Sequence, residues 1–278
     1  MIRPTSLLFV ALAALTVSEV SGQVKQTDDS DNVSKEQTQR EKVFSHRQNI
    51  AKNAKVAIDA KATTLHETPI YRYHEVVRGF HDGTTWMWKD SKGRPAMILN
   101  LSGKDRTFYE FISLTNSQLS CSINGFLWKP EAGWKPKAIP NAKEPTQKRV
   151  TRKLQMRAMA KKFTSKMIDV NSGRKEVIRM LPEPIFRYKQ ETETTLDGAL
   201  FAFVRDGDLE VILTIEAEKD PKTGVVRWVF DCDRVCSSEQ HVSFEDQEVW
   251  TCPRGFPGIT GQNYGRYIRS PANSRALQ

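Results

Sequence analysis

The sequence predicts an α+β protein made of two homologous units, each with one helix packed on an antiparallel meander sheet of about five strands. Three observations lead to this prediction. A motif in the first half of the chain recurs in the second half, each copy follows a stretch with helical apolar spacing, and each copy precedes several short β-forming runs. A unit of this kind buries one face of its sheet under the helix.

The recurring motif has two parts. The pentapeptide at 69–73 (PIYRY) returns at 184–188 (PIFRY), and the Asp-Gly pair at 82–83 returns at 197–198. Both parts keep the same offset of 115 positions, which coincidence does not readily produce. We therefore expect a duplication, and we interpret the two aspartates that precede glycine as turn residues.

Two pairs of aromatic residues follow the motif. Trp86 and Trp88 in the first copy are replaced by Phe201 and Phe203 in the second. A spacing of two residues places each pair on one face of a strand. One interpretation is a platform for stacking sugar rings, but the exchange of Trp for Phe keeps only apolar bulk. We therefore favour core packing.

The N-terminus, residues 1–22, has the pattern of a secretory signal peptide. Arg3 is followed by an apolar run at 7–17, and small residues at 20–22 favour cleavage before Gln23. The alternative is a membrane anchor, but a span needs roughly 20 apolar residues and this run is shorter. We expect a soluble mature protein that is secreted or periplasmic, with no transmembrane anchor.

Composition divides the rest of the chain into five segments. The expected boundaries are a flexible lead-in at 23–40, a first unit at 41–128, a Pro/Lys-rich linker at 129–150, a second unit at 151–252 and a flexible tail at 253–278.

Each unit is expected to open with a helix. The first is predicted at about 40–61 from a weak apolar stripe, and the second at about 151–169 from a stronger one. The apolar residues of the second stripe recur at steps of three and four positions: Met156, Met159, Phe163 and Met167.

Short β-forming runs follow each predicted helix. The predicted strands lie at 70–77, 84–89, 96–101, 107–114, 210–217 and 225–231. Asn124-Gly125, between 119–123 and 126–129, is a strong signal for a hairpin with a type I′ turn.

Three of the four cysteines are in the second unit. Their spacing lacks the paired arrangement of a zinc site, so no metal is expected. An exported protein favours disulfides. We expect Cys252 to pair with Cys232 or Cys236 and prefer Cys232–Cys252. The alternative is unpaired thiols that pack as small apolar groups.

The positive charge is concentrated in one segment. Lys and Arg number 42 against 33 Asp and Glu, and residues 148–175 alone hold ten cations and one acid. On a helix, Arg149, Lys153, Arg157 and Lys161 share one face, which predicts a site for an anionic ligand. The alternative is a solvated face whose cations keep the apolar side turned inward.

Motifs for catalysis are missing from the sequence. It has no nucleophile elbow, phosphate-binding loop or HExxH pair, and His74 and His81 are interpreted as ordinary surface or half-buried residues. We therefore predict no catalytic residue and no cofactor. An exported protein without a recognisable module is not expected to bind nucleic acid.

Several sequence pieces resemble an uncharacterised family of secreted proteins from planctomycete bacteria. These are PIFRY, DGALFAFV, DLEVILTIEA and a terminal EVW, with FLWKPEAGWKPKAIPNA and LQMRAMAKKF similar to the linker and second helix of that family. The resemblance covers about 41–252 and is stronger in the second half. It implies an envelope location and no assigned activity, and the cysteine cluster departs from the pattern.

Together these observations predict a secreted or periplasmic non-enzymatic protein that binds an anionic envelope polymer, such as an anionic polysaccharide, through a basic helix. The alternative is an enzyme that acts on envelope polysaccharide with a site between the two units. A structure in which His74, His81, Asp82 and Asp197 lie apart would count against that alternative.

Overall fold

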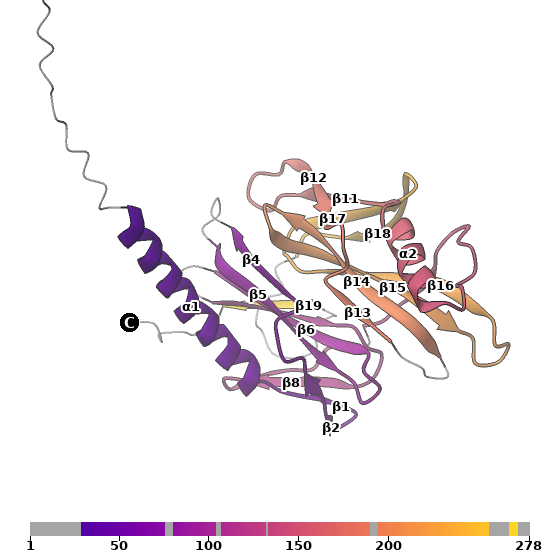
Figure 1. Cartoon of the computed structure of the whole chain (residues 1–278), viewed down its shortest axis with the longest axis horizontal. Coiled ribbons are helices and arrows are strands. Elements are labelled where there is room, and N and C mark those ends of the chain that lie inside the picture. The colour runs from indigo at the N-terminus through magenta and orange to yellow at the C-terminus, as the bar shows by residue number, and fades with distance from the viewer. Residues whose placement is uncertain are drawn as a thin grey trace, which may run out of the picture. The chain divides into compact units, whose positions relative to one another are not determined.

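Antiparallel strands make up most of the chain in the computed structural model, which has a mixed α/β fold with two helices in its described residues (Figure 1). The described residues are 29–75, 80–103, 107–131, 133–189, 194–255 and 267–271. The chain forms two compact units, residues 1–38 and 39–278, and everything below concerns the second unit unless stated otherwise. The predicted signal peptide and most of the predicted tail lie outside the described residues.

The first helix, α1 (Asp29–Asn53), begins and ends earlier than its apolar stripe predicts. Its first turns come from residues that the sequence assigned to a flexible lead-in. The chain then forms β1 (Lys55–Ile58), because Val56 and Ile58 are β-branched and alternate with smaller residues. The predicted extension of the helix to residue 61 is therefore wrong.

The second helix, α2 (Arg149–Ala160), is also shorter than predicted. Residues Phe163–Ile168 form β11, with Phe163 and Met167 buried and the intervening lysine exposed. A strand buries every second residue, so a four-residue step fits strand as well as helix. The predicted helix over 161–169 is wrong for this reason, although the whole apolar stripe does enter one core.

Nine strands of the described residues precede the linker. Besides β1 they are β2 (Lys61–Ala62), β3 (Thr64–Leu65), β4 (Tyr71–Glu75), β5 (Phe80–Lys89), β6 (Pro95–Ser102), β7 (Phe108–Ser113), β8 (Leu119–Ile123) and β9 (Phe126–Trp128). The hairpin between β8 and β9 is confirmed: Asn124 and Gly125 have φ of 48° and 79°, as a type I′ turn requires.

The remaining strands follow the linker or lie in it. Besides β11 they are β10 (Lys137–Ala138), β12 (Lys175–Met180), β13 (Phe186–Tyr188), β14 (Thr195–Arg205), β15 (Asp208–Lys219), β16 (Val226–Arg234), β17 (Glu239–Phe244), β18 (Gln247–Cys252) and β19 (Tyr267–Pro271).

Strand pairing follows the same order before and after the linker. In the first half (residues 39–128), β4, β5, β6 and β7 pair in sequence, and β1, β8 and β9 pair in sequence. In the second half (149–252), β13 to β16 pair in sequence, and so do β11, β17 and β18. The pair β3–β5 has its counterpart in β12–β14.

Three apolar cores fill the described part of the fold. One lies between α1 and the strands of the first half and contains Trp86 and Trp88. A second lies under α2 and contains Phe201 and Phe203. Figure 1 shows the two helices that cover these cores. These four side chains are at most 2% exposed, so the expectation of core packing is confirmed. The third core joins the opposite faces of β5–β7 and of β13–β15, and also contains Val235 after β16.

The third core is bordered by contacts that run in both directions between the halves. Arg94, in the turn after β5, donates to the Glu216 carboxylate of β15 at 2.7 Å. Conversely, Gly207, in the turn after β14, accepts a hydrogen bond from the Tyr71 hydroxyl of β4 at 2.8 Å. Each half therefore places the turn of its central hairpin against the other half.

Candidate functional site

The four predicted anion-binding residues lie along one side of α2 and at its end. Arg149, Lys153 and Arg157 follow one another at four-residue steps, and Lys161 is the residue that caps the helix. The Glu183 carboxylate lies 2.7 Å from Arg157 Nη2 and 3.6 Å from Lys153 Nζ. One acid therefore serves two of the four cations.

A pocket of about 270 Å³ separates the end of α2 from the strands beneath it. It is lined by Arg157, Ala160, Lys161, Phe163, Met180, Leu181, Pro182 and Phe201. The structure thus brings Arg157 and Lys161 to one apolar cavity, whereas Arg149 and Lys153 lie outside its lining.

The rest of the basic segment does not extend this helix face. Lys162 lies past the end of α2 and pairs with Glu245 at 2.6 Å, while Lys166 is on β11 and Lys175 is on β12. The positive charge predicted for one helix is therefore divided among a helix, a turn and two strands.

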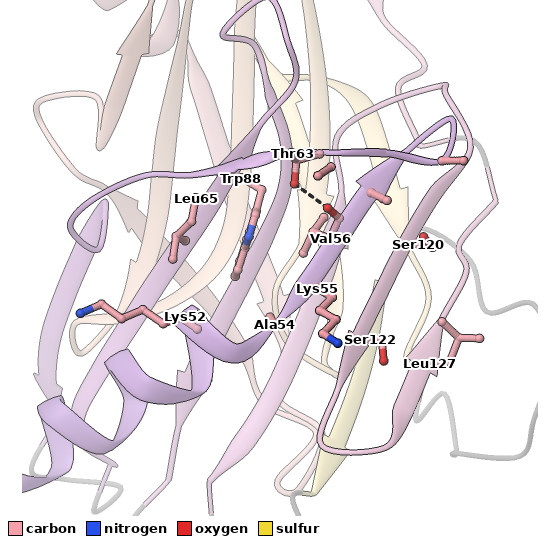
Figure 2. A pocket seen from close by; sticks show the side chains of 14 residues that line it. Lys52, Ala54, Lys55, Val56, Thr63, Leu65, Trp88, Ser120, Ser122 and Leu127 are labelled. Atoms are coloured by element: carbon pink, nitrogen blue, oxygen red, sulfur yellow. Dashed lines mark hydrogen bonds between the residues drawn. The ribbon is translucent and has the colours of Figure 1, made fainter.

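A larger pocket, of about 600 Å³, lies beside the end of α1 (Figure 2). It is lined by Ala51, Lys52, Ala54, Lys55, Val56, Ala57, Ala60, Ala62, Thr63, Leu65, Trp88, Ser120, Ser122 and Leu127. No motif in the sequence predicts this pocket. Its sequence signature is the high alanine content of residues 51–62, because small side chains leave part of a strand face uncovered.

Strand register explains the shape of this larger pocket. Val56 is buried and pairs with Cys121 in the first core, so its neighbours on β1 face outward. Lys55 is opposite Ser122, and Ala57 is opposite both Ser120 and Ala62. The floor between these strands consists of alanine and serine, which are too small to fill it.

The two pockets occupy matching places in the two halves. The larger one lies between the end of α1 and the β3–β5 pair, where Leu65 is opposite Trp88. The smaller one lies between the end of α2 and the β12–β14 pair, where Met180 is opposite Phe203. Each combines an apolar floor with two cations.

The two aspartates predicted as turn residues are instead the centres of buried ion pairs. Asp82 on β5 binds Arg40 Nε at 3.0 Å and Arg72 Nη2 at 3.0 Å. Asp197 on β14 binds Arg152 Nε at 3.0 Å and Arg187 Nη2 at 2.7 Å. The turn interpretation is wrong.

Burial and the neighbouring arginines shift the pKa of the Asp82 carboxyl in opposite directions. Burial favours the neutral acid, but the hydrogen bonds and charges of Arg40 and Arg72 outweigh it and lower the pKa of the carboxyl. Arg47 adds a further contact by donating to the backbone carbonyl of Asp82. Each of the two aspartates therefore forms ion pairs with arginines of its own half, which stabilise the fold.

The glycines of the motif are required by the tyrosines. Tyr73 is opposite Gly83, and Tyr188 is opposite Gly198. A Cβ atom at Gly83 would lie 2.0 Å from the Tyr73 ring, and one at Gly198 would lie 2.3 Å from the Tyr188 ring. The Tyr188 hydroxyl donates a hydrogen bond to the Glu216 carboxylate. Burial is the main cause that raises the pKa of the Tyr188 phenol, and the negative charge of Glu216 raises it further.

The cysteines are unbridged in the structure, so the disulfide stays a prediction. Cys232 is buried in the core under α2, whereas Cys252 is opposite Gln240 at the end of β18. Gln240 Nε2 donates to Cys236 Sγ at 3.0 Å. The register therefore favours Cys236 over Cys232 as the partner of Cys252.

The described residues contain no group of three or more His, Cys, Asp or Glu side chains that could hold a metal ion. His74 lies on β4, and the side chain of His81 is outside the described part. Neither α1 nor α2, the helices that the structure describes, is long and apolar enough to cross a membrane. No protein-family model, curated protein or solved structure matches this chain.

Proposed function

We propose that this chain is an exported, non-enzymatic envelope protein that binds an anionic polymer through the basic face of α2. The observation that carries the proposal is the row formed by Arg149, Lys153 and Arg157, which continues into Lys161 at the pocket. Glu183 pairs with two of the four cations, Lys153 and Arg157, and supplies a single negative charge, so the face keeps a positive charge.

The geometry of the row suits repeated anionic groups on a linear polymer. A rise of about 1.5 Å per residue puts Arg149 and Arg157 roughly 12 Å apart along the helix axis. The guanidinium groups can bind carboxylate or phosphate with two parallel hydrogen bonds, and the lysines contribute charge. The neighbouring Val150 and Leu154, 76% and 57% exposed, add apolar contact area beside the cations.

We further propose that the two halves are homologous. The shared order of strand pairing supports this, as does the reuse of one construction in each half: an Arg-Tyr strand paired with an Asp-Gly strand. In both copies arginines bind the aspartate and the tyrosine ring lies over the glycine.

Two observations support export: the signal-peptide pattern of the N-terminal residues and the resemblance to secreted planctomycete proteins. When the full chain is expressed with its own N-terminus in a Gram-negative host, we expect protein from the periplasm or medium to begin at Gln23. N-terminal sequencing checks this. An uncleaved chain that remains in the cytoplasm would contradict it.

Binding is tested by neutralising the row. Replacing Arg149, Lys153, Arg157 and Lys161 by glutamine should weaken binding to polygalacturonate at least about 10-fold, because each exposed charge contact contributes on the order of 0.5 kcal/mol. Binding is measured by biolayer interferometry at low salt, and the wild-type affinity should fall as salt rises.

A second variant controls for net charge. It carries glutamine at Lys42, Lys61, Lys92 and Lys129, four exposed lysines that lie on α1, on β2, between β5 and β6, and just after β9. It changes the total charge equally and should bind almost as the wild type does. Equal weakening in both variants would mean that binding is nonspecific, and unchanged binding of the α2 variant would overturn the proposal.

A further inference from the structure

The pocket at the end of α1 has the composition of a site for an anionic amphiphile. We propose that it binds a molecule with a hydrocarbon chain and a carboxylate headgroup, with the headgroup at Lys55 and Ser122. This site shares no residue with the basic face of α2, so the inference stands apart from the proposed function.

The floor of the pocket is suited to a hydrocarbon chain. Apolar side chains line it: Ala57 is opposite Ala62, and Leu65 is opposite Trp88 of the first core. Burying apolar surface stabilises a complex by about 25 cal/mol per Å². A volume of about 600 Å³ is within the range of small-molecule sites, so the pocket can hold a chain of medium length.

The rim of the pocket is suited to an anion. Lys55 and Ser122 are directly opposite each other on β1 and β8, and Figure 2 shows the lysine reaching towards the serine hydroxyl. In the described residues, neither side chain has a hydrogen-bond or ion-pair partner. An ammonium group and a hydroxyl on two directly paired residues can both donate to one carboxylate.

The charge of the lining excludes a cationic headgroup. Its two charged residues are Lys52 and Lys55, and no acidic residue lines it. The matching pocket at the end of α2 differs in this respect, because Glu183 already binds Arg157 there. One of the two cations that line the α2 pocket is therefore paired with an acid, whereas neither Lys52 nor Lys55 shares its pocket lining with one.

Lys52 supplies an internal control. It lines the same pocket, but Figure 2 shows its side chain extending away from Lys55 and Ser122. Replacing either lysine by glutamine removes one positive charge, yet only Lys55→Gln removes a headgroup contact.

The test is isothermal titration calorimetry of the full mature chain with decanoate below its micellar concentration, at pH 7. We expect decanoate to bind, and decanol and decyltrimethylammonium to bind at least about 10-fold more weakly because they lack the negative charge. Lys55→Gln should weaken decanoate binding about 10-fold, the effect of losing one charge-assisted hydrogen bond. Lys52→Gln should weaken it less than about 3-fold.

A filling variant tests the chain site separately. Ala57→Leu places a larger side chain between Ser120 and Ala62 and should abolish decanoate binding. Circular dichroism and the thermal midpoint confirm that each variant folds, and Ser122→Ala provides a milder second change at the headgroup. The proposal is overturned if decanoate does not bind, if decanol binds equally well, or if Lys55→Gln and folded Ala57→Leu both bind as the wild type does.

Discussion

Replacing Asp197 by alanine is expected to lower the free energy of unfolding by about 3–5 kcal/mol, because it leaves a buried arginine without its counter-ion. The Asp197 carboxylate is fully buried and is held by Arg152 Nε at 3.0 Å and Arg187 Nη2 at 2.7 Å. The Arg152 side chain is only 9% exposed, so water cannot readily replace the lost carboxylate. Urea denaturation followed by circular dichroism measures the loss.

The equivalent change in the first half is the control. The Asp82 partners Arg40 and Arg72 are 40% and 39% exposed, so both guanidinium groups can be hydrated once the carboxylate is gone. The buried Arg47 donates to the backbone carbonyl of residue 82, which the substitution keeps. Asp82→Ala should therefore cost clearly less than Asp197→Ala. An equal or larger loss for Asp82→Ala would show that exposure of the arginines does not determine the effect.

Gly198→Ala is expected to destabilise the protein by about 3 kcal/mol, at the upper end of the usual cost of overpacking. The added methyl group would lie 2.3 Å from Cζ and 2.5 Å from Cε2 of Tyr188. Gly198 does not have positive φ, so the backbone itself accepts alanine and the cost comes from the ring.

A double-mutant cycle isolates that contact. In a Tyr188→Ala background the ring is absent, so adding Gly198→Ala should cost less than about 1 kcal/mol. The thermal midpoints and urea midpoints of the four proteins in the cycle give the coupling. If the glycine substitution costs the same with and without the ring, the close approach of ring and strand is not what requires glycine.

Much of the strand order could be predicted from the sequence. Short apolar, β-forming runs identified the central strands β6, β7, β15 and β16, and Asn124-Gly125 identified the β8–β9 hairpin, because these signals depend on local sequence. The ends of both helices could not be predicted. Phe163 and Met167 continue the spacing of the α2 stripe, and their position on β11 depends on pairing with β17 in the distant sequence.

The sites were predicted less well than the fold. Charge clustering found Arg157 and Lys161, which do line a pocket, because charge is visible in the sequence. The ion pairs of Asp82 and Asp197 were missed, since an Asp-Gly pair looks the same in a turn and in a bulged strand. The pocket at α1 was missed because it depends on the register of β1, β2 and β8.

The exchange of hairpin turns between the halves has a consequence for assembly. A contact in which each partner offers the same element to the other is the pattern of an isologous dimer interface with a twofold axis. Here Arg94 and Gly207 make the two reciprocal contacts within a single chain. Because the linker holds both partners at a high effective concentration, this interface forms without dependence on protein concentration. If one ancestral unit gave rise to both halves, this contact within the chain takes the place of a contact between two copies of that unit.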